Sequence, residues 1–89
     1  MYFLMYKNKN DDYIFSQFRY IDDLKQYCNV IFNENFKSYK DIKKFTETID
    51  LDRTWLSTNK AELEKIIWNR EISKGRNHAI QMIYRLREL

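Results

Sequence analysis

YFLMYKNKNDDYIFSQF, residues 2–18, contains two short runs of aromatic and aliphatic side chains on either side of a polar segment. Aromatic and β-branched residues favour strands, and the Asn and Asp residues of segment 7–12 tolerate the backbone angles of a turn. The pattern therefore predicts a β-hairpin with strands near 2–6 and 13–18. Large apolar side chains fall on both faces of this hairpin. We expect one face to pack on helices and the other to meet a partner.

The residues that follow the hairpin have the spacing of two amphipathic helices. Apolar side chains recur at intervals of three and four residues from Ile21 to Ile31, which predicts a helix over 20–31. Ser38 precedes Asp41 by three residues, which is the spacing of a helix cap, and so predicts the start of a second helix. The apolar stripe of this second helix consists of Ile42, Phe45 and Ile49.

The last third of the chain is also predicted to be helical. Asn59 is a suitable N-cap for a helix that begins at the next residue. Gly75, the single glycine of the chain, has the character of a helix stop. We expect two helices, at 60–74 and 77–88. The alternative is one long bent helix, because a lone interior glycine costs a helix only about 1 kcal/mol.

Together these elements predict an α+β fold in a single domain over residues 1–89. It comprises an N-terminal two-stranded β-hairpin followed by three to four α-helices, and it is mostly helical. Eighty-nine residues fall within the size range of one domain. Hydrophobic residues make up 44% of the chain and aromatic residues 17%, which argues against disorder.

The composition indicates a cytoplasmic protein. Cys28 is the only cysteine, so no intrachain disulfide can form, and its helical spacing with apolar neighbours predicts a small buried side chain. No segment has the pattern of a signal peptide or the length of a membrane span. Lys, Ile, Asn, Tyr and Phe abound while Pro is absent, a bias typical of A/T-rich genomes. We therefore expect the cytoplasm of a low-GC bacterial host cell.

The sequence contains no catalytic or cofactor-binding signature. The pairs Asp23/Lys25 and Asp41/Lys43 have the D-x-K spacing of some nucleases, but residues two apart on a helix do not share a face. One glycine cannot build a phosphate-binding loop. His78 is the only histidine, and with a single cysteine it cannot complete a zinc site. We predict that the protein is not an enzyme and has no cofactor or metal.

The net charge of +3 resides almost entirely in the last third of the chain. A cluster of cations there predicts a surface that binds nucleic acid or a protein acting on nucleic acid. This predicted basic patch consists of Arg70, Lys74, Arg76, Arg85 and Arg87. The alternative interpretation is that these side chains complement helix dipoles and keep the helix surfaces solvated.

A second stretch resembles part of a known DNA-binding motif. The sequence DLDRTWLS at residues 50–57 resembles the turn and the start of the second helix in phage-type helix-turn-helix repressors, and Ser38 resembles the start of their first helix. Over residues 38–57 the resemblance implies a helix that reads the major groove. On that interpretation the DNA-reading side chains are Arg53, Thr54, Ser57, Thr58 and Lys60.

In general character the chain resembles the small orphan proteins of phages and mobile elements, among them anti-CRISPR and other anti-defence inhibitors. Size, composition and the lack of a catalytic motif carry this resemblance, so it implies no particular residues. It implies a non-catalytic interaction protein that binds a host protein or ribonucleoprotein acting on nucleic acid, such as a defence nuclease. Direct contact with DNA or RNA is compatible with it. The alternative function is a helix-turn-helix transcriptional regulator.

Overall fold

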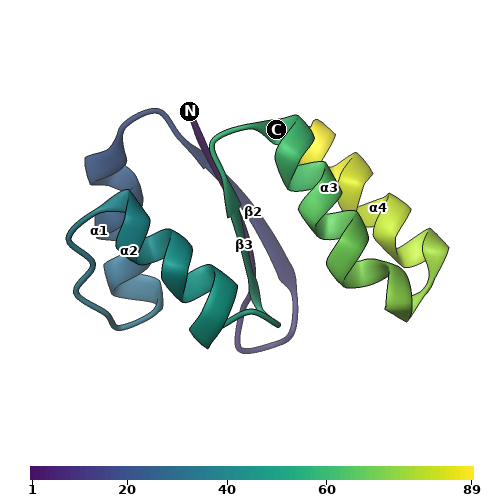
Figure 1. The fold of residues 1–89 in the computed structure, drawn as a ribbon, viewed down its shortest axis with the longest axis horizontal. Coiled ribbons are helices and arrows are strands. Elements are labelled where there is room, and N and C mark those ends of the chain that lie inside the picture. The colour runs from purple at the N-terminus through teal and green to yellow at the C-terminus, as the bar shows by residue number, and fades with distance from the viewer.

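A three-stranded antiparallel sheet separates two pairs of helices in the computed structural model, which describes all of residues 1–89 (Figure 1). The predicted α+β class, with an N-terminal hairpin and mostly helical content, is confirmed. The regular elements are β1 (Tyr2–Lys7), β2 (Tyr13–Phe18), α1 (Ile21–Ile31), α2 (Tyr39–Lys44), β3 (Thr54–Ser57), α3 (Lys60–Glu71) and α4 (Arg76–Arg87). A π-helical turn, Phe45–Ile49, continues α2, and a 3-10 turn, Ile72–Lys74, continues α3.

The predicted hairpin forms the first two strands of the sheet. The strand order is β2-β1-β3, so β1 is central and pairs antiparallel with both neighbours. Asn8 shapes the connecting turn, since its Oδ1 accepts hydrogen bonds from the backbone N–H groups of Asn10 at 2.9 Å and Asp12 at 3.0 Å. Asp11 in this turn adopts φ 62°, which Asp tolerates better than most residues.

Alternation along β1 sends its side chains to two separate cores. Phe3 and Met5 pack with α3 and α4, whereas Leu4, between them, packs with α1 and α2. Burying each such side chain contributes roughly 1.5–3 kcal/mol to stability. Helices thus cover both faces of the sheet (Figure 1), and the expectation that one face of the hairpin meets a partner is wrong.

The helical predictions for the first half hold, with one exception. Helix α1 begins one residue later than predicted, Cys28 is fully buried, and the Oγ of Ser38 caps α2 by accepting from the N–H of Asp41 at 3.3 Å. Ile49, predicted in the apolar stripe of α2, is instead 76% exposed. The π-helical turn explains this, because its wider hydrogen-bonded ring rotates Ile49 away from the core.

Strand β3 stands where the helix-turn-helix resemblance placed the start of a helix, so that local prediction is wrong. Thr54–Ser57 pairs with the free edge of β1, with Met5 opposite Trp55. Trp55 enters the α3/α4 core and Leu56 the α1/α2 core. This period of two satisfies both cores at once, which a helix at this position could not do.

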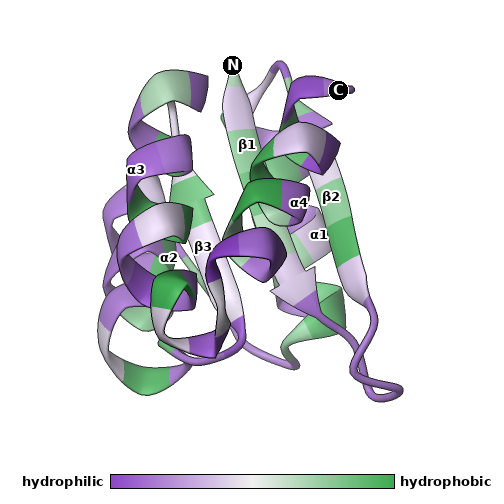
Figure 2. Cartoon of the chain, turned by 90° about the vertical axis from the view of Figure 1, so that its right-hand side faces the viewer, coloured by the Kyte–Doolittle hydropathy of each residue, from purple (hydrophilic) through white to green (hydrophobic).

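The last third forms two helices, as predicted, and not one. The Oδ1 of Asn59 caps α3 by accepting from the N–H groups of Ala61 and Glu62. Gly75 separates the helices with φ 122°, a conformation that only glycine adopts without strain. Figure 2 looks onto this helical layer, with largely polar segments along α3 and apolar segments in the strands behind it. None of the helices is both long and apolar enough to cross a membrane.

Candidate functional site

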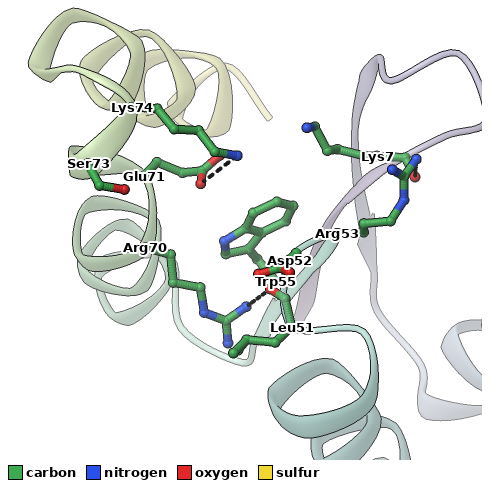
Figure 3. A pocket seen from close by; sticks show the side chains of 9 residues that line it. All are labelled: Lys7, Leu51, Asp52, Arg53, Trp55, Arg70, Glu71, Ser73 and Lys74. Carbon is green, nitrogen blue, oxygen red and sulfur yellow. Dashed lines mark hydrogen bonds and ion pairs between the residues drawn. The ribbon is translucent and has the colours of Figure 1, made fainter.

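A pocket of about 720 Å³ lies where the end of β1 and the start of β3 face the C-terminal end of α3 (Figure 3). A turn and the ends of strands and helices supply most of its walls, so side chains far apart in the sequence meet there. The pocket is lined by Lys7, Leu51, Asp52, Arg53, Trp55, Arg70, Glu71, Ser73 and Lys74. We call it the cationic pocket, because four of these residues are basic and two are acidic.

Two of the four cations have no carboxylate partner. Arg53 pairs with Asp11 at 3.0 Å and Lys74 with Glu71 at 3.4 Å, whereas Lys7 and Arg70 form no ion pair. The ammonium of Lys7 lies 5.2 Å from the centroid of the Tyr13 ring, which is cation–π distance. The pocket therefore keeps uncompensated positive charge on opposite walls.

Arg70 joins the pocket wall to the edge of the sheet. Its Nη1 donates to the backbone carbonyl of Leu51 at 3.1 Å and to that of Thr54 at 2.6 Å. Its guanidinium also lies 6.0 Å from the centroid of the Trp55 ring. Burial lowers the pKa of Arg70, although a guanidinium remains protonated at neutral pH. Arg70 thus has a structural role as well as a charge facing the pocket.

Arg53 connects the opposite wall to the hairpin turn. Besides its ion pair with Asp11, its Nη2 donates to the backbone carbonyl of Asn8 at 2.5 Å. The backbone carbonyl of Arg53 in turn accepts from the N–H of Lys7 at 2.9 Å. These contacts fix the end of β1, and with it the backbone position from which the Lys7 side chain extends.

Glu71 anchors a polar network at the back of the pocket. Its side chain is almost completely buried, and its Oε1 accepts from the Tyr13 hydroxyl at 2.9 Å and contacts His78 Nε2 at 3.2 Å. Burial alone would raise the pKa of Glu71, but the hydrogen bonds from His78 and Tyr13 and the charge of Lys74 outweigh it. The pKa is held below its usual range, so the carboxylate stays ionised as a fixed acceptor.

Trp55 lies at the centre of the pocket wall and carries an unpartnered donor. The residue is 1% exposed, and its Nε1 is buried with no hydrogen-bond acceptor of the chain in reach. Tyr13 packs on the indole at a centroid distance of 5.9 Å. In Figure 3 the indole sits among the charged side chains, with its nitrogen on the side of Arg70 and Glu71.

The predicted basic patch is not one surface. Arg70 and Lys74 line the cationic pocket, and Arg76 is exposed at the start of α4. Arg85 lies about 14 Å further along the same helix, from the helical rise of roughly 1.5 Å per residue, and donates to the Tyr13 carbonyl at 2.8 Å. Arg87 pairs with Glu64 at 2.7 Å. The grouping fails because α4 carries its two basic ends to opposite ends of the layer.

The residues predicted to read DNA do not share an exposed surface either. Thr54 and Ser57 are buried in β3, at 0% and 1% exposure. Arg53 lies at the cationic pocket, whereas Lys60 lies beyond the other end of β3 and donates to the Leu89 carbonyl at 2.7 Å. Thr58 is exposed beside Lys60. The strand conformation of this segment separates side chains that a helix would have gathered.

Sequence reasoning missed Lys7, Trp55 and Glu71 as members of one site. Lys7 falls in the segment predicted to form a turn, and Glu71 belongs to no motif in the sequence. No local pattern joins three residues that lie on β1, β3 and α3. The alternation of Trp55 and Leu56 between two cores is the one signal that could have placed part of the site.

No family model matches the chain, and the comparisons with curated proteins and with solved structures find no match. No group of three or more His, Cys, Asp and Glu side chains is arranged to hold a metal ion. The lining residues of the pocket offer positive charge and one buried N–H donor.

Proposed function

We propose that this chain is a small non-catalytic interaction protein that uses the cationic pocket to bind a host protein or ribonucleoprotein acting on nucleic acid. Inhibition of a defence nuclease, as in anti-CRISPR proteins, is the form of this function that its size and composition favour. The observation that carries the proposal is the convergence of Lys7, Arg53, Arg70 and Lys74 around one hollow.

The charge distribution favours an acidic or phosphate-bearing partner surface. Lys7 and Arg70 stand without carboxylate partners, so their charge is available to a ligand. Concave sites with an excess of one sign of charge concentrate the opposite charge and speed association. The chain has a small net charge of +3. The local excess of positive charge in the pocket therefore matters more than the electrostatic field of the whole protein.

The state of the Glu71 network supports a binding role over a catalytic one. The carboxylate accepts from Tyr13 and lies within hydrogen-bond or ion-pair distance of His78 and Lys74, and its pKa is lowered. A general base works best when its pKa is near neutrality and a substrate proton can reach it. Glu71 meets neither condition, and acts as a scaffold that holds α3, α4 and β2 together.

The experiment compares neutralised variants of two lysine pairs. Lys7→Gln with Lys74→Gln removes two charges from the pocket, and Lys37→Gln with Lys40→Gln removes two exposed charges near the start of α2. Each tagged variant is used to capture partners from a nuclease-treated bacterial lysate. Captured nucleases are then assayed for DNA cleavage with the purified protein added.

We expect the wild type and the control pair to retain the partner and to reduce its cleavage activity. The pocket pair should bind about tenfold more weakly or worse, since a hydrogen bond to a charged group is worth roughly 1.5–3 kcal/mol. Equal capture by the pocket pair would show that another surface binds. Capture of no nucleic-acid-processing protein by the wild type would overturn the proposed function.

A further inference from the structure

We propose that the cationic pocket is a phosphate-binding site in which the Trp55 indole N–H donates to a phosphate oxygen between Lys7 and Lys74. This inference deepens the proposed function by naming the chemical group that the pocket recognises. It is carried by Trp55, whose donor is buried and unpartnered while the residue lines a pocket with a net positive charge.

The unpartnered donor calls for an acceptor. A buried N–H without a hydrogen bond destabilises a folded protein, and nearly all such groups in proteins find a partner. Tyr13 and Arg70 pack on the Trp55 ring, but neither offers an acceptor to its nitrogen. An oxygen that settles against this edge of the indole would restore the missing hydrogen bond.

The surroundings of that donor favour an anionic oxygen. Four cations face two carboxylates in the pocket, and one of the carboxylates, Glu71, is already engaged by Tyr13, His78 and Lys74. Asp52 is the only acid left to oppose a ligand. Hydrogen bonds to an ionised acceptor are shorter and about twice as strong as neutral ones.

The directions of the donors favour phosphate over carboxylate. In Figure 3 the ammonium of Lys7 lies on one side of the Trp55 ring and Arg70 and Lys74 lie on the other, whereas the Arg53 guanidinium turns away toward the backbone of Lys7. A tetrahedral phosphate presents oxygens to both sides and to the floor at once, whereas the two oxygens of a carboxylate lie in one plane. The volume of about 720 Å³ also leaves room for a group esterified to the phosphate.

Two sources can supply this group, namely inorganic phosphate and the terminal phosphate of a nucleic-acid strand. The test follows the indole N–H resonance of Trp55 in ¹⁵N-labelled protein. Trp68→Phe removes the only other indole, so one resonance remains and its assignment is certain. The protein is titrated with inorganic phosphate, with a short 5′-phosphorylated oligonucleotide and with the same oligonucleotide bearing a 5′-hydroxyl.

We expect the Trp55 resonance to shift saturably with inorganic phosphate and with the phosphorylated strand. The strand with the 5′-hydroxyl should bind about tenfold more weakly, a difference of about 1.4 kcal/mol. A shift with inorganic phosphate alone would assign the site to a free phosphate compound. A resonance that moves with none of the three, or equally with both strands, would overturn the inference.

A matched pair of variants ties the shift to the pocket. Lys7→Met removes a pocket cation, and Lys9→Met removes an exposed lysine two residues away on the turn. The first should weaken phosphate binding about tenfold, and the second should leave it unchanged within error. Partner capture by the wild type without any phosphate effect on Trp55 would refute this inference and leave the proposed function standing.

Discussion

The two faces of the sheet carry cores of different character. On the α1/α2 side the core is apolar and aromatic, and its nearest polar pair is self-contained, with the Tyr6 and Tyr27 hydroxyls 2.7 Å apart. On the α3/α4 side the core includes Trp55 with an unpaired donor and borders the buried carboxylate of Glu71. The side with the unpartnered hydrogen-bond donor is the one that opens into the pocket.

Under the proposed function, the two helical layers divide stability and ligand binding between them. A layer in which every polar group is satisfied internally contributes stability alone. A layer that leaves a donor and several cations unmatched gives up some stability and gains a place for a ligand. The assignment of stability to one face and binding to the other can be tested by substitution.

The largest expected effect comes from truncating one leucine in each core. Leu24 on α1 and Leu63 on α3 are both fully buried, so Leu24→Ala and Leu63→Ala should each lower the free energy of unfolding by about 2–5 kcal/mol. Urea denaturation measures both values. An effect below about 1 kcal/mol for one of them would mean that this helix layer is not a true core.

A smaller effect is expected from Glu71→Gln, which keeps the shape but removes the charge from the buried network. It should cost about 1–3 kcal/mol, because Lys74 and His78 lose their ionised partner. Denaturant unfolding at pH 7 measures the loss. Glu64→Gln, which alters the exposed ion pair with Arg87, is the control and should change stability by less than about 1 kcal/mol.

The same carboxylate predicts a pH dependence with a definite sign. The folded-state pKa of Glu71 lies below its ordinary value of roughly 4.3, so its contribution is complete above that pH. It is lost as the pH falls through the lowered pKa. The stability gap between the wild type and Glu71→Gln should therefore narrow below about pH 4. A gap that widened in acid would show that Glu71 is protonated in the folded protein.

The smallest expected effect, that of Tyr6→Phe, belongs to a comparison that separates the two faces most directly. Tyr6→Phe removes the hydroxyl paired with Tyr27 on the α1/α2 side, and Tyr13→Phe removes a donor to Glu71 on the other side. The first should cost about 0.5–1.5 kcal/mol and the second about 1.5–3 kcal/mol, since only the second hydrogen bond involves a charged group. Thermal unfolding measures the loss of stability in each variant. A larger loss for Tyr6→Phe than for Tyr13→Phe would contradict the difference between the two faces of the sheet.

Local sequence patterns were sufficient to predict the secondary-structure elements that are long or capped. The hairpin followed from two aromatic runs around an Asn/Asp turn, α3 from the Asn59 cap, and the break between α3 and α4 from Gly75. Strand β3 could not be predicted in this way, because four residues are too few to establish a period of two. Its conformation is imposed by the free edge of β1 and by the two cores on either side.

The candidate site was less predictable than the fold because it is made of tertiary contacts. Arg70 and Lys74 were singled out from charge alone, but their companions Lys7 and Arg53 come from the end of β1 and the turn before β3. Charge clustering in sequence also grouped Arg85 and Arg87 with them, although each has a separate structural partner. Only the folded arrangement distinguishes a cation that faces a pocket from one that is already engaged.

The hydrogen bond from Arg70 to the Thr54 carbonyl bears on how far the sheet can grow. Lys43 makes an equivalent bond to the carbonyl of Leu56, so both outward-facing acceptors of β3 are occupied by cationic side chains. With its outward carbonyls occupied, β3 is a poorer template for a strand of another chain. A substitution of Arg70 would therefore free the Thr54 carbonyl at this edge as well as altering the pocket.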